Sequence, residues 1–182
     1  MGVGVEAVLI TGVFGVGKST VAADLADVLE AAGVKYAALD LDWLTWSNAN
    51  GPTRADEHRM MIANLIAVVD NYRVAGATRF VMARTIRDSD ELDSLTDALG
   101  MSVRTVELIV PLAEIAIRLH TDPKEGREGD LRRTAEWISS GLGSGLGGIA
   151  VTNDRPVREV TAEILHWLGW VHSSVVSDDS LA

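Results

Sequence analysis

The chain of 182 residues contains no cysteine, which excludes disulfide bonds, thiolate metal sites and a cysteine nucleophile. Basic residues are also scarce: 16 Lys and Arg stand against 26 Asp and Glu, and the net charge is −10. A groove that binds a nucleic-acid backbone needs a basic surface. The charge imbalance therefore argues against nucleic acid as a partner.

Long apolar runs are missing as well. No run approaches the roughly 18 residues of a membrane-spanning helix, although hydrophobic residues make up 47% of the chain. The first residues lack the basic start and the cleavage site of a signal peptide. We therefore expect a cytoplasmic protein that has no membrane partner.

Residues 12–19, Gly-Val-Phe-Gly-Val-Gly-Lys-Ser, have the spacing G-x-x-x-x-G-K-[ST] of the phosphate-binding loop called Walker A. A loop that wraps phosphates brings its N–H groups close to oxygen, which favours glycine. Lys18 can reach the β- and γ-phosphates, and the Ser19 hydroxyl can hold Mg²⁺. The predicted nucleotide-binding residues of this segment are Gly12, Gly15, Val16, Gly17, Lys18, Ser19 and Thr20.

Strand and helix patterns alternate along the chain, which is typical of a parallel sheet covered on both faces. Short apolar runs predict five strands, at residues 6–10, 35–41, 78–83, 103–110 and 148–152. Amphipathic patterns predict helices at about residues 18–32, 53–75, 88–99, 111–119, 131–139 and 157–168. The sequence therefore predicts an α/β fold, a three-layer sandwich whose five-stranded parallel sheet has helices on both faces.

Two segments near the end of the chain are poor in apolar residues. Residues 121–130 are polar and charged, and we predict that they form a small mobile lid. The glycine-rich residues 141–148 predict a flexible connector; they follow no strand, so they do not predict a dinucleotide-binding loop. We expect a single domain over residues 1–172 that includes the lid, and a frayed tail at 173–182.

Asp40 and Asp42 stand at the C-terminal end of the second predicted strand. Ligands of such sheets bind outside the carboxyl ends of the strands, and alternation along the strand puts both carboxylates on one face. Two carboxylates beside Mg²⁺ and a substrate hydroxyl can divide the roles of metal ligand and general base. The alternative is a solvated helix start in which Asp42 is the N-cap.

Three further side chains could contact a substrate at this edge of the sheet. Arg84 ends the third predicted strand, and Trp43 and Trp46 follow the two aspartates. Two tryptophans beside the site could line a pocket for an apolar or ring-shaped substrate. The alternatives are an ordinary surface arginine and two tryptophans that pack in the core.

With Walker A near its start and a charged segment before the last strand, the chain resembles the small-molecule kinases of the P-loop superfamily. This group holds adenylylsulfate kinase, shikimate kinase, gluconate kinase and chloramphenicol phosphotransferase. Residues 39–42, Leu-Asp-Leu-Asp, resemble the L-D-G-D of adenylylsulfate kinase, and residues 56–59 and 64–66 resemble its E-D-R and E-N-I. Residues 82–85, Met-Ala-Arg-Thr, replace its sulfate-cradling F-I-S-P, which argues against adenylylsulfate as the acceptor.

The resemblance implies a kinase that uses ATP and Mg²⁺ to phosphorylate a hydroxyl group of a small-molecule acceptor. The implied catalytic residues are Lys18, Asp42, which faces the acceptor, and Arg127, which closes over the phosphates. The implied binding residues are Ser19 and Asp40 for Mg²⁺, Arg118 and Pro156 for adenine, and Asp42, Trp43, Trp46 and Arg84 for the acceptor.

A nucleotide-binding protein without phosphotransferase activity is the alternative, either a switch or a resistance protein that sequesters its ligand. A hydrolytic switch would normally use an acidic residue at the end of the third strand, and Arg84 stands there instead. The sequence therefore favours the kinase.

Overall fold

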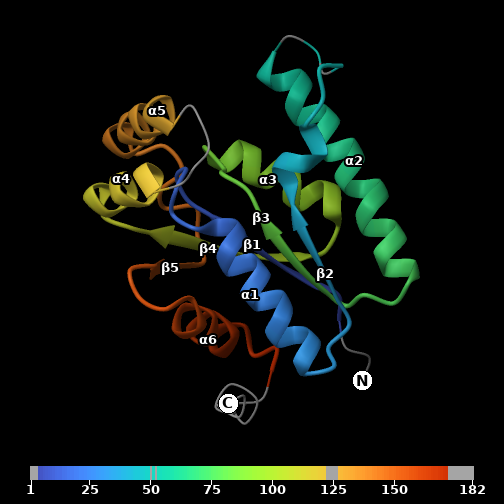
Figure 1. The fold of residues 1–182 in the computed structure, drawn as a ribbon. Coiled ribbons are helices and arrows are strands. Elements are labelled where there is room, and N and C mark those ends of the chain that lie inside the picture. The colour runs from blue at the N-terminus through green and yellow to red at the C-terminus, as the bar shows by residue number, and fades with distance from the viewer. Residues whose placement is uncertain (1–3, 50, 52, 122–126, 172–182) are drawn as a thin grey trace.

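Figure 1 shows the computed structural model of the chain, which describes residues 4–49, 51, 53–121 and 127–171. The strands are β1 Glu6–Thr11, β2 Tyr36–Asp40, β3 Arg79–Ala83, β4 Ser102–Ile109 and β5 Ile149–Thr152. They form one sheet in the order β2-β3-β1-β4-β5, and every pair of neighbours is parallel. The predicted α/β fold with a five-stranded parallel sheet is confirmed.

Helices cover both faces of the sheet (Figure 1). They are α1 Lys18–Ala31, α2 Arg54–Val74, α3 Ser89–Leu99, α4 Leu112–Thr121, α5 Arg127–Ser140 and α6 Val157–Leu168, and a 3₁₀ helix, η1, spans Leu41–Thr45. Alternation along β1 sends Val8 and Ile10 into one core, with side chains of α1, α4 and α6. Ala7 and Leu9 enter the other core, with side chains of α2 and α3.

The parallel register brings the carboxyl ends of three strands to one level. Ile10 in β1 and Asp40 in β2 both lie opposite Ala83 in β3. The segments that leave these strands therefore emerge at the same edge of the sheet. They carry the phosphate-binding loop, Asp42 and Arg84, which lie far apart in the sequence.

The start of α2 is fixed by a capping box, which the spacing of Thr53 and Asp56 in the sequence predicts. The Thr53 side chain accepts a hydrogen bond from the backbone N–H of Asp56, and the Asp56 carboxylate accepts one from the backbone N–H of Thr53. This arrangement fixes the first turn of the helix and hence the position of Arg54, the residue that follows the cap.

Helix α5 begins at Arg127, four residues before the predicted start at Leu131. The last four residues of the predicted lid are therefore helical. Residues 122–126 and the predicted tail at 173–182 lie outside the described residues, so the lid and the tail stay predictions. None of the helices in the described part of the chain combines the length and the apolar character needed to cross a bilayer.

The glycine-rich segment 141–148 packs more closely than a flexible connector would. The backbone N–H of Gly143 donates a hydrogen bond to the Arg87 carbonyl over 2.7 Å. Gly148 has a φ of 74°, and a Cβ atom there would lie only 1.8 Å from the backbone oxygen of Thr105. Glycine at this position therefore lets the chain pass against β4.

We expect Gly148→Ala to lower the free energy of unfolding by roughly 2–4 kcal/mol, from left-handed strain and displacement of Thr105. Gly145→Ala is the matched control, because Gly145 has a φ of 70° but no atom within 4 Å of an added Cβ. It should lose only about 1–2 kcal/mol. Urea unfolding of both variants makes the comparison, and equal losses would show that the contact with Thr105 does not matter.

Candidate active site

The phosphate-binding loop joins β1 to α1 and has the backbone that its glycines permit. Gly12, Gly15 and Gly17 have φ values of 133°, 87° and 93°, a region that side chains with a Cβ disfavour. Gly17 is the N-cap of α1, and no side chain caps this helix start. The first N–H groups of α1 and the positive end of its dipole are therefore open to an anion.

Asn153, which follows β5, contacts the phosphate-binding loop and stabilises its position. Its side-chain amide is buried and donates a hydrogen bond to the Val16 carbonyl over 2.7 Å. A Cβ on Gly17 would lie 2.7 Å from the Asn153 amide nitrogen. Val16 therefore contributes a carbonyl to this support and a buried side chain to the core, while Ser19 and Thr20 are exposed at the start of α1.

The Lys18 side chain contacts the backbone of the phosphate-binding loop, and its ammonium group is largely buried. Its side-chain nitrogen donates a hydrogen bond to the Val13 carbonyl over 3.1 Å, and the residue is only 9% exposed. Burial lowers the pKa of Lys18 to about 8, against the opposing effects of Asp42 and Asp40. Near pH 8 the free protein therefore holds a partly deprotonated Lys18, and a bound phosphate would favour its protonated form.

We expect an ATP analogue that binds at pH 8 to cause uptake of about half a proton per protein, because phosphate charge raises the lowered pKa of Lys18. Titration calorimetry in buffers of different ionisation enthalpy measures this uptake. Lys18→Met should bind the analogue without it. An equal uptake by this variant would mean that another group titrates.

Ser19 and Asp40 come together as a pair of oxygen donors. The Ser19 hydroxyl donates a hydrogen bond to Asp40 Oδ2 over 2.8 Å, and Asp40 Oδ1 accepts one from the backbone N–H of Asp42. Asp40, rather than Asp42, is thus the N-cap of η1. A hydroxyl and a carboxylate suit Mg²⁺, which keeps most of its other positions for water and phosphate oxygen.

Such a two-residue site differs from a metal centre built by the protein alone. In the described residues, no group of three His, Cys, Asp or Glu side chains could hold a metal ion. Two oxygen donors fit a Mg²⁺ ion whose remaining ligands are water and phosphate oxygens.

Asp42 lies beside the loop, and its carboxylate pairs with Arg84. Arg84 Nη1 donates a hydrogen bond to Asp42 Oδ1 over 3.1 Å. Partial loss of hydration raises the pKa of Asp42 even though 67% of its side chain is exposed, while Arg84 acts in the opposite direction. A carboxylate with a raised pKa and an open side has the properties of a general base.

Arg84 is a buried side chain, with 5% exposed, and not the surface arginine that the sequence left possible. Its Nη1 donates to the Leu41 carbonyl as well as to Asp42, and its Nη2 lies 3.7 Å from Glu57 Oε1. The guanidinium therefore fixes η1 and the Asp42 carboxylate relative to β3.

Trp43 and Trp46 are exposed by 65% and 76%, so neither packs in the core. Their ring centroids lie 4.5 Å apart. An exposed aromatic pair directly after Asp42 is a surface on which a flat substrate could stack.

Arg118 lies on the opposite side of the loop from Asp42, where α4 meets the end of β5. Its Nη2 donates hydrogen bonds to Glu114 Oε1 and to the Asn153 carbonyl, each over 2.6 Å. Pro156, which follows Asn153 by three residues, is the N-cap of α6. The structure thus brings both predicted adenine residues to the segment that supports the phosphate-binding loop.

Helix α5 contacts the phosphate-binding loop directly. The buried hydroxyl of Thr134 donates a hydrogen bond to the Phe14 carbonyl over 3.2 Å. Arg127 is the first residue of this helix, and its side chain lies outside the described part of the structure.

The sequence interpretation missed the residues that surround Arg84. Glu57 and Glu91 lie next to its guanidinium, and Arg54 binds Glu91. The one local signal was the position of Glu91, three residues after Asp88, where helix-capping carboxylates occur. Its contact with a side chain of α2 has no signature in the sequence.

A family model for adenylylsulphate kinase matches residues 5–156 of the chain. A sugar kinase from Janibacter sp. HTCC2649 is 20% identical, with a TM-score of 0.68 over 94% of this chain and 98% of its own. A gluconokinase from Sinorhizobium meliloti 1021 is 22% identical, with a TM-score of 0.62 over 90% of this chain and 91% of its own.

An APS kinase from Mycobacterium tuberculosis, in complex with AMPPNP and APS, is 24% identical. Its TM-score is 0.63 over 91% of this chain and 98% of its own. No curated protein sequence matches the chain. At these identities the solved structures establish a common fold.

Proposed function

The chain belongs to the adenylylsulphate kinase family, and from that premise we propose that it transfers the γ-phosphoryl group of ATP to a hydroxyl of a small molecule. The observation that carries this proposal is the meeting of Asp42, Asp40 and Lys18 at one edge of the sheet. Lys18 responds to the charge of both carboxylates, and Asp40 binds Ser19 at the start of α1. A phosphate cradle, a pair of oxygen donors and a candidate base therefore adjoin one another.

In the proposed reaction the acceptor oxygen attacks the γ-phosphorus, and the Asp42 carboxylate takes the hydroxyl proton. The new bond joins the acceptor oxygen to phosphorus, and the bond to the β,γ-bridging oxygen breaks to release ADP. Lys18 and the N–H groups of the loop stabilise the charge that moves onto the phosphate oxygens. Arg84 keeps the Asp42 carboxylate in one orientation during this step.

Other residues would bind the nucleotide. Mg²⁺ bound together with ATP would offset charge on the phosphates, and Ser19 and Asp40 are the residues that would hold it. Arg118 and Pro156 would flank the adenine ring. Arg127, at the start of α5, would approach the transferred group as a lid arginine.

We propose that the acceptor is not adenylylsulfate. Buried Arg84 follows β3 where the resemblance would have a segment that cradles sulfate, and its guanidinium is engaged by Asp42 and Glu57. The exposed rings of Trp43 and Trp46 support a ring-shaped acceptor that stacks beside Asp42.

The test is a panel of hydroxylated small molecules, sugars, sugar acids, nucleosides and antibiotics among them, incubated with ATP and Mg²⁺. Mass spectrometry should show at least one acceptor that gains a phosphoryl group, and adenylylsulfate should gain none. The alternative, a nucleotide-binding protein that transfers nothing, predicts nucleotide binding without a phosphorylated product from any acceptor.

A further inference from the structure

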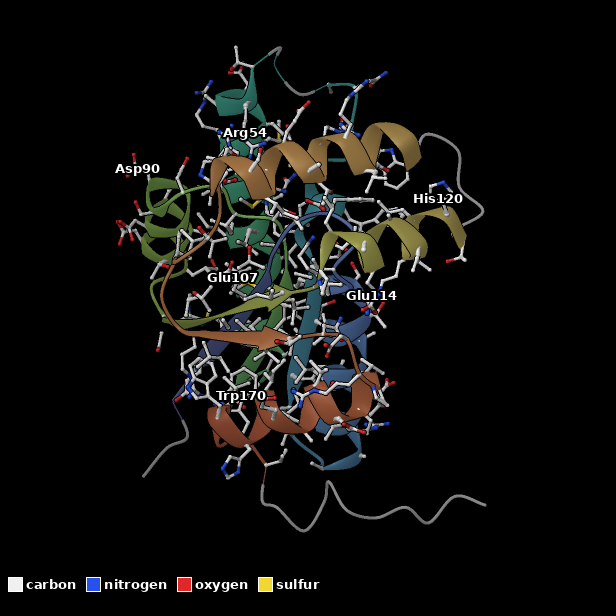
Figure 2. The ribbon with its side chains drawn as sticks, turned by 90° about the vertical axis from the view of Figure 1, so that its left-hand side faces the viewer. Arg54, Asp90, Glu107, Glu114, His120 and Trp170 are labelled. Atoms are coloured by element: carbon white, nitrogen blue, oxygen red, sulfur yellow. The ribbon has the colours of Figure 1, made fainter. Side chains whose placement is uncertain are left out.

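A cavity of about 440 Å³ lies between the phosphate-binding loop, the start of α2 and α5. Phe14 and Trp137 contribute aromatic walls, and Arg54 and Arg87 line it from α2 and from the segment after β3. Figure 2 labels Arg54 and views the molecule from the side of helix α5, from which Trp137 comes. The volume is sufficient for a small metabolite.

One buried carboxylate holds both of these arginines. Glu91, whose side chain is 8% exposed, accepts hydrogen bonds from Arg54 Nη2 over 3.3 and 3.4 Å and from the backbone N–H of Arg87 over 3.0 Å. The Nε atoms of Arg84 and Arg87 lie 3.9 and 4.0 Å from it, and His58 Nδ1 lies 3.8 Å away. Glu91 therefore lies within 4.0 Å of three guanidinium groups, hydrogen-bonds one of them and holds the backbone of Arg87.

The guanidinium groups that face the cavity are paired with fewer carboxylates than Arg84 is. Arg84 faces two further carboxylates, those of Asp42 and Glu57. Among the described residues, Glu91 is the only carboxylate that pairs with Arg54 and Arg87, so this side of the cluster has one more positive than negative charge, while the three guanidinium groups and three carboxylates of the whole cluster balance. The Arg54 and Arg87 side chains are 41% and 38% exposed, and Arg87 Nε is buried with no hydrogen-bond partner among the described residues. In a chain with a net charge of −10, such an excess is a local feature.

The opposite wall of the cavity, formed by α5, carries more negative than positive charge. On α5, Arg133 pairs with Asp130, and Glu136 adds a further carboxylate. An anion that enters the cavity would therefore approach Arg54 and Arg87 and not α5. Guanidinium groups with N–H donors that have no partner among the described residues, such as Arg87 Nε, match the oxygens of a carboxylate or of a phosphate or sulfate ester.

We propose that Arg54 and Arg87, positioned by Glu91, form a subsite for an anionic group of the acceptor. This inference rests on the proposed function and names the class of acceptor, a hydroxylated molecule that carries a carboxylate or a phosphate- or sulfate-type group. Arg84 contacts both Glu91 and Asp42, so the subsite adjoins the base. The aromatic rings of Phe14 and Trp137 line the space beside the anion.

Inorganic sulfate is the probe, and AMPPNP with Mg²⁺ fills the phosphate-binding loop so that sulfate cannot bind there. Thermal unfolding is followed against sulfate concentration, with sodium chloride at matched ionic strength as the reference. Sulfate should stabilise the nucleotide-loaded protein saturably. Arg54→Gln and Arg87→Gln should each weaken this binding by roughly tenfold, while Arg87→Lys retains part of it.

Arg59→Gln is the matched control, because Arg59 lies on α2, pairs with Asp56 and does not line the cavity. It should bind sulfate as the unchanged protein does. Circular dichroism of each variant without sulfate checks that the fold is intact. No saturable effect of sulfate, or equal affinity in Arg54→Gln and Arg87→Gln, would overturn the subsite.

The acceptor panel separates this inference from the proposed function. Transfer to anionic acceptors, with a KM for the acceptor that rises in Arg87→Gln while the KM for ATP stays constant, supports both. Transfer only to neutral acceptors, unchanged by Arg54→Gln or Arg87→Gln, rejects the subsite and keeps the kinase. Sulfate binding that depends on both arginines, without transfer to any acceptor, rejects the kinase and keeps the subsite.

Discussion

Lys18→Ala should lower the rate of phosphoryl transfer by roughly 10³-fold or more, because it removes the charge that stabilises the transferred phosphoryl group. The substitution should not unfold the protein. Lys18 makes one hydrogen bond to a loop carbonyl, and burial of its charge in the free protein is unfavourable, as its lowered pKa of about 8 indicates. Transfer rates and urea unfolding curves of the variant test both statements.

Lys35→Ala is the control for this prediction, because Lys35 stands before β2 and its side chain is not among the residues assigned to the site. It should transfer phosphate at the rate of the unchanged protein. A folded Lys18→Ala protein with near-normal turnover would remove the basis for a nucleotide site at the loop.

Asp42→Asn should reduce the transfer rate by roughly 10²–10⁴, the usual contribution of a general base. The amide keeps the size of the side chain and can still accept a hydrogen bond from Arg84, but it cannot take the acceptor proton. The affinity for Mg²⁺ and ATP should change little. Steady-state kinetics at saturating Mg²⁺ measures the rate.

Asp40→Asn is the matched variant, since it changes the other carboxylate of the same strand end. It removes charge beside Ser19, so it should raise the Mg²⁺ concentration needed for activity. A Mg²⁺ titration of both variants separates the roles. If Asp40→Asn loses activity at saturating Mg²⁺ while Asp42→Asn keeps it, the two roles are reversed.

The pH dependence gives an independent check on Asp42. A base works only when deprotonated, so activity should fall as the pH falls through the pKa of Asp42. Loss of hydration raises that pKa, with a further contribution from Asp40. The acid limb of kcat/KM should therefore lie above the ordinary range of a carboxyl group, and Asp40→Asn should move it downward.

The sequence was sufficient for features that depend on local pattern. Glycine spacing and flanking apolar runs predict the phosphate-binding loop between β1 and α1, and the position after the second strand predicts that Asp40 and Asp42 share an edge with it. The predicted strand alternation does not extend to Asp42, because β2 ends at Asp40 and Asp42 lies in η1. Thr53 and Asp56 predict the cap of α2. Each of these depends on residues a few positions apart, and sequence periodicity reports such relations directly.

The sequence did not predict contacts between segments that lie far apart in the chain. Arg84 could be a surface residue or a buried one until Asp42, 42 positions away, was found beside it. Glu91 binds Arg54 across 37 positions, and no periodicity records that meeting. The exposure of Trp43 and Trp46 and the close packing of Gly148 against Thr105 likewise depend on how elements dock, which composition does not specify.

The central claim is that this protein moves the γ-phosphoryl group of ATP to an acceptor hydroxyl with Asp42 as base. ATP labelled with ¹⁸O in its γ-phosphoryl group, incubated with Mg²⁺ and the acceptor panel, tests it by mass spectrometry. We expect a labelled phosphoester on an acceptor, formed roughly 10²–10⁴ times more slowly by Asp42→Asn. Labelled inorganic phosphate without any labelled acceptor, or an equal rate of transfer by Asp42→Asn, would contradict it.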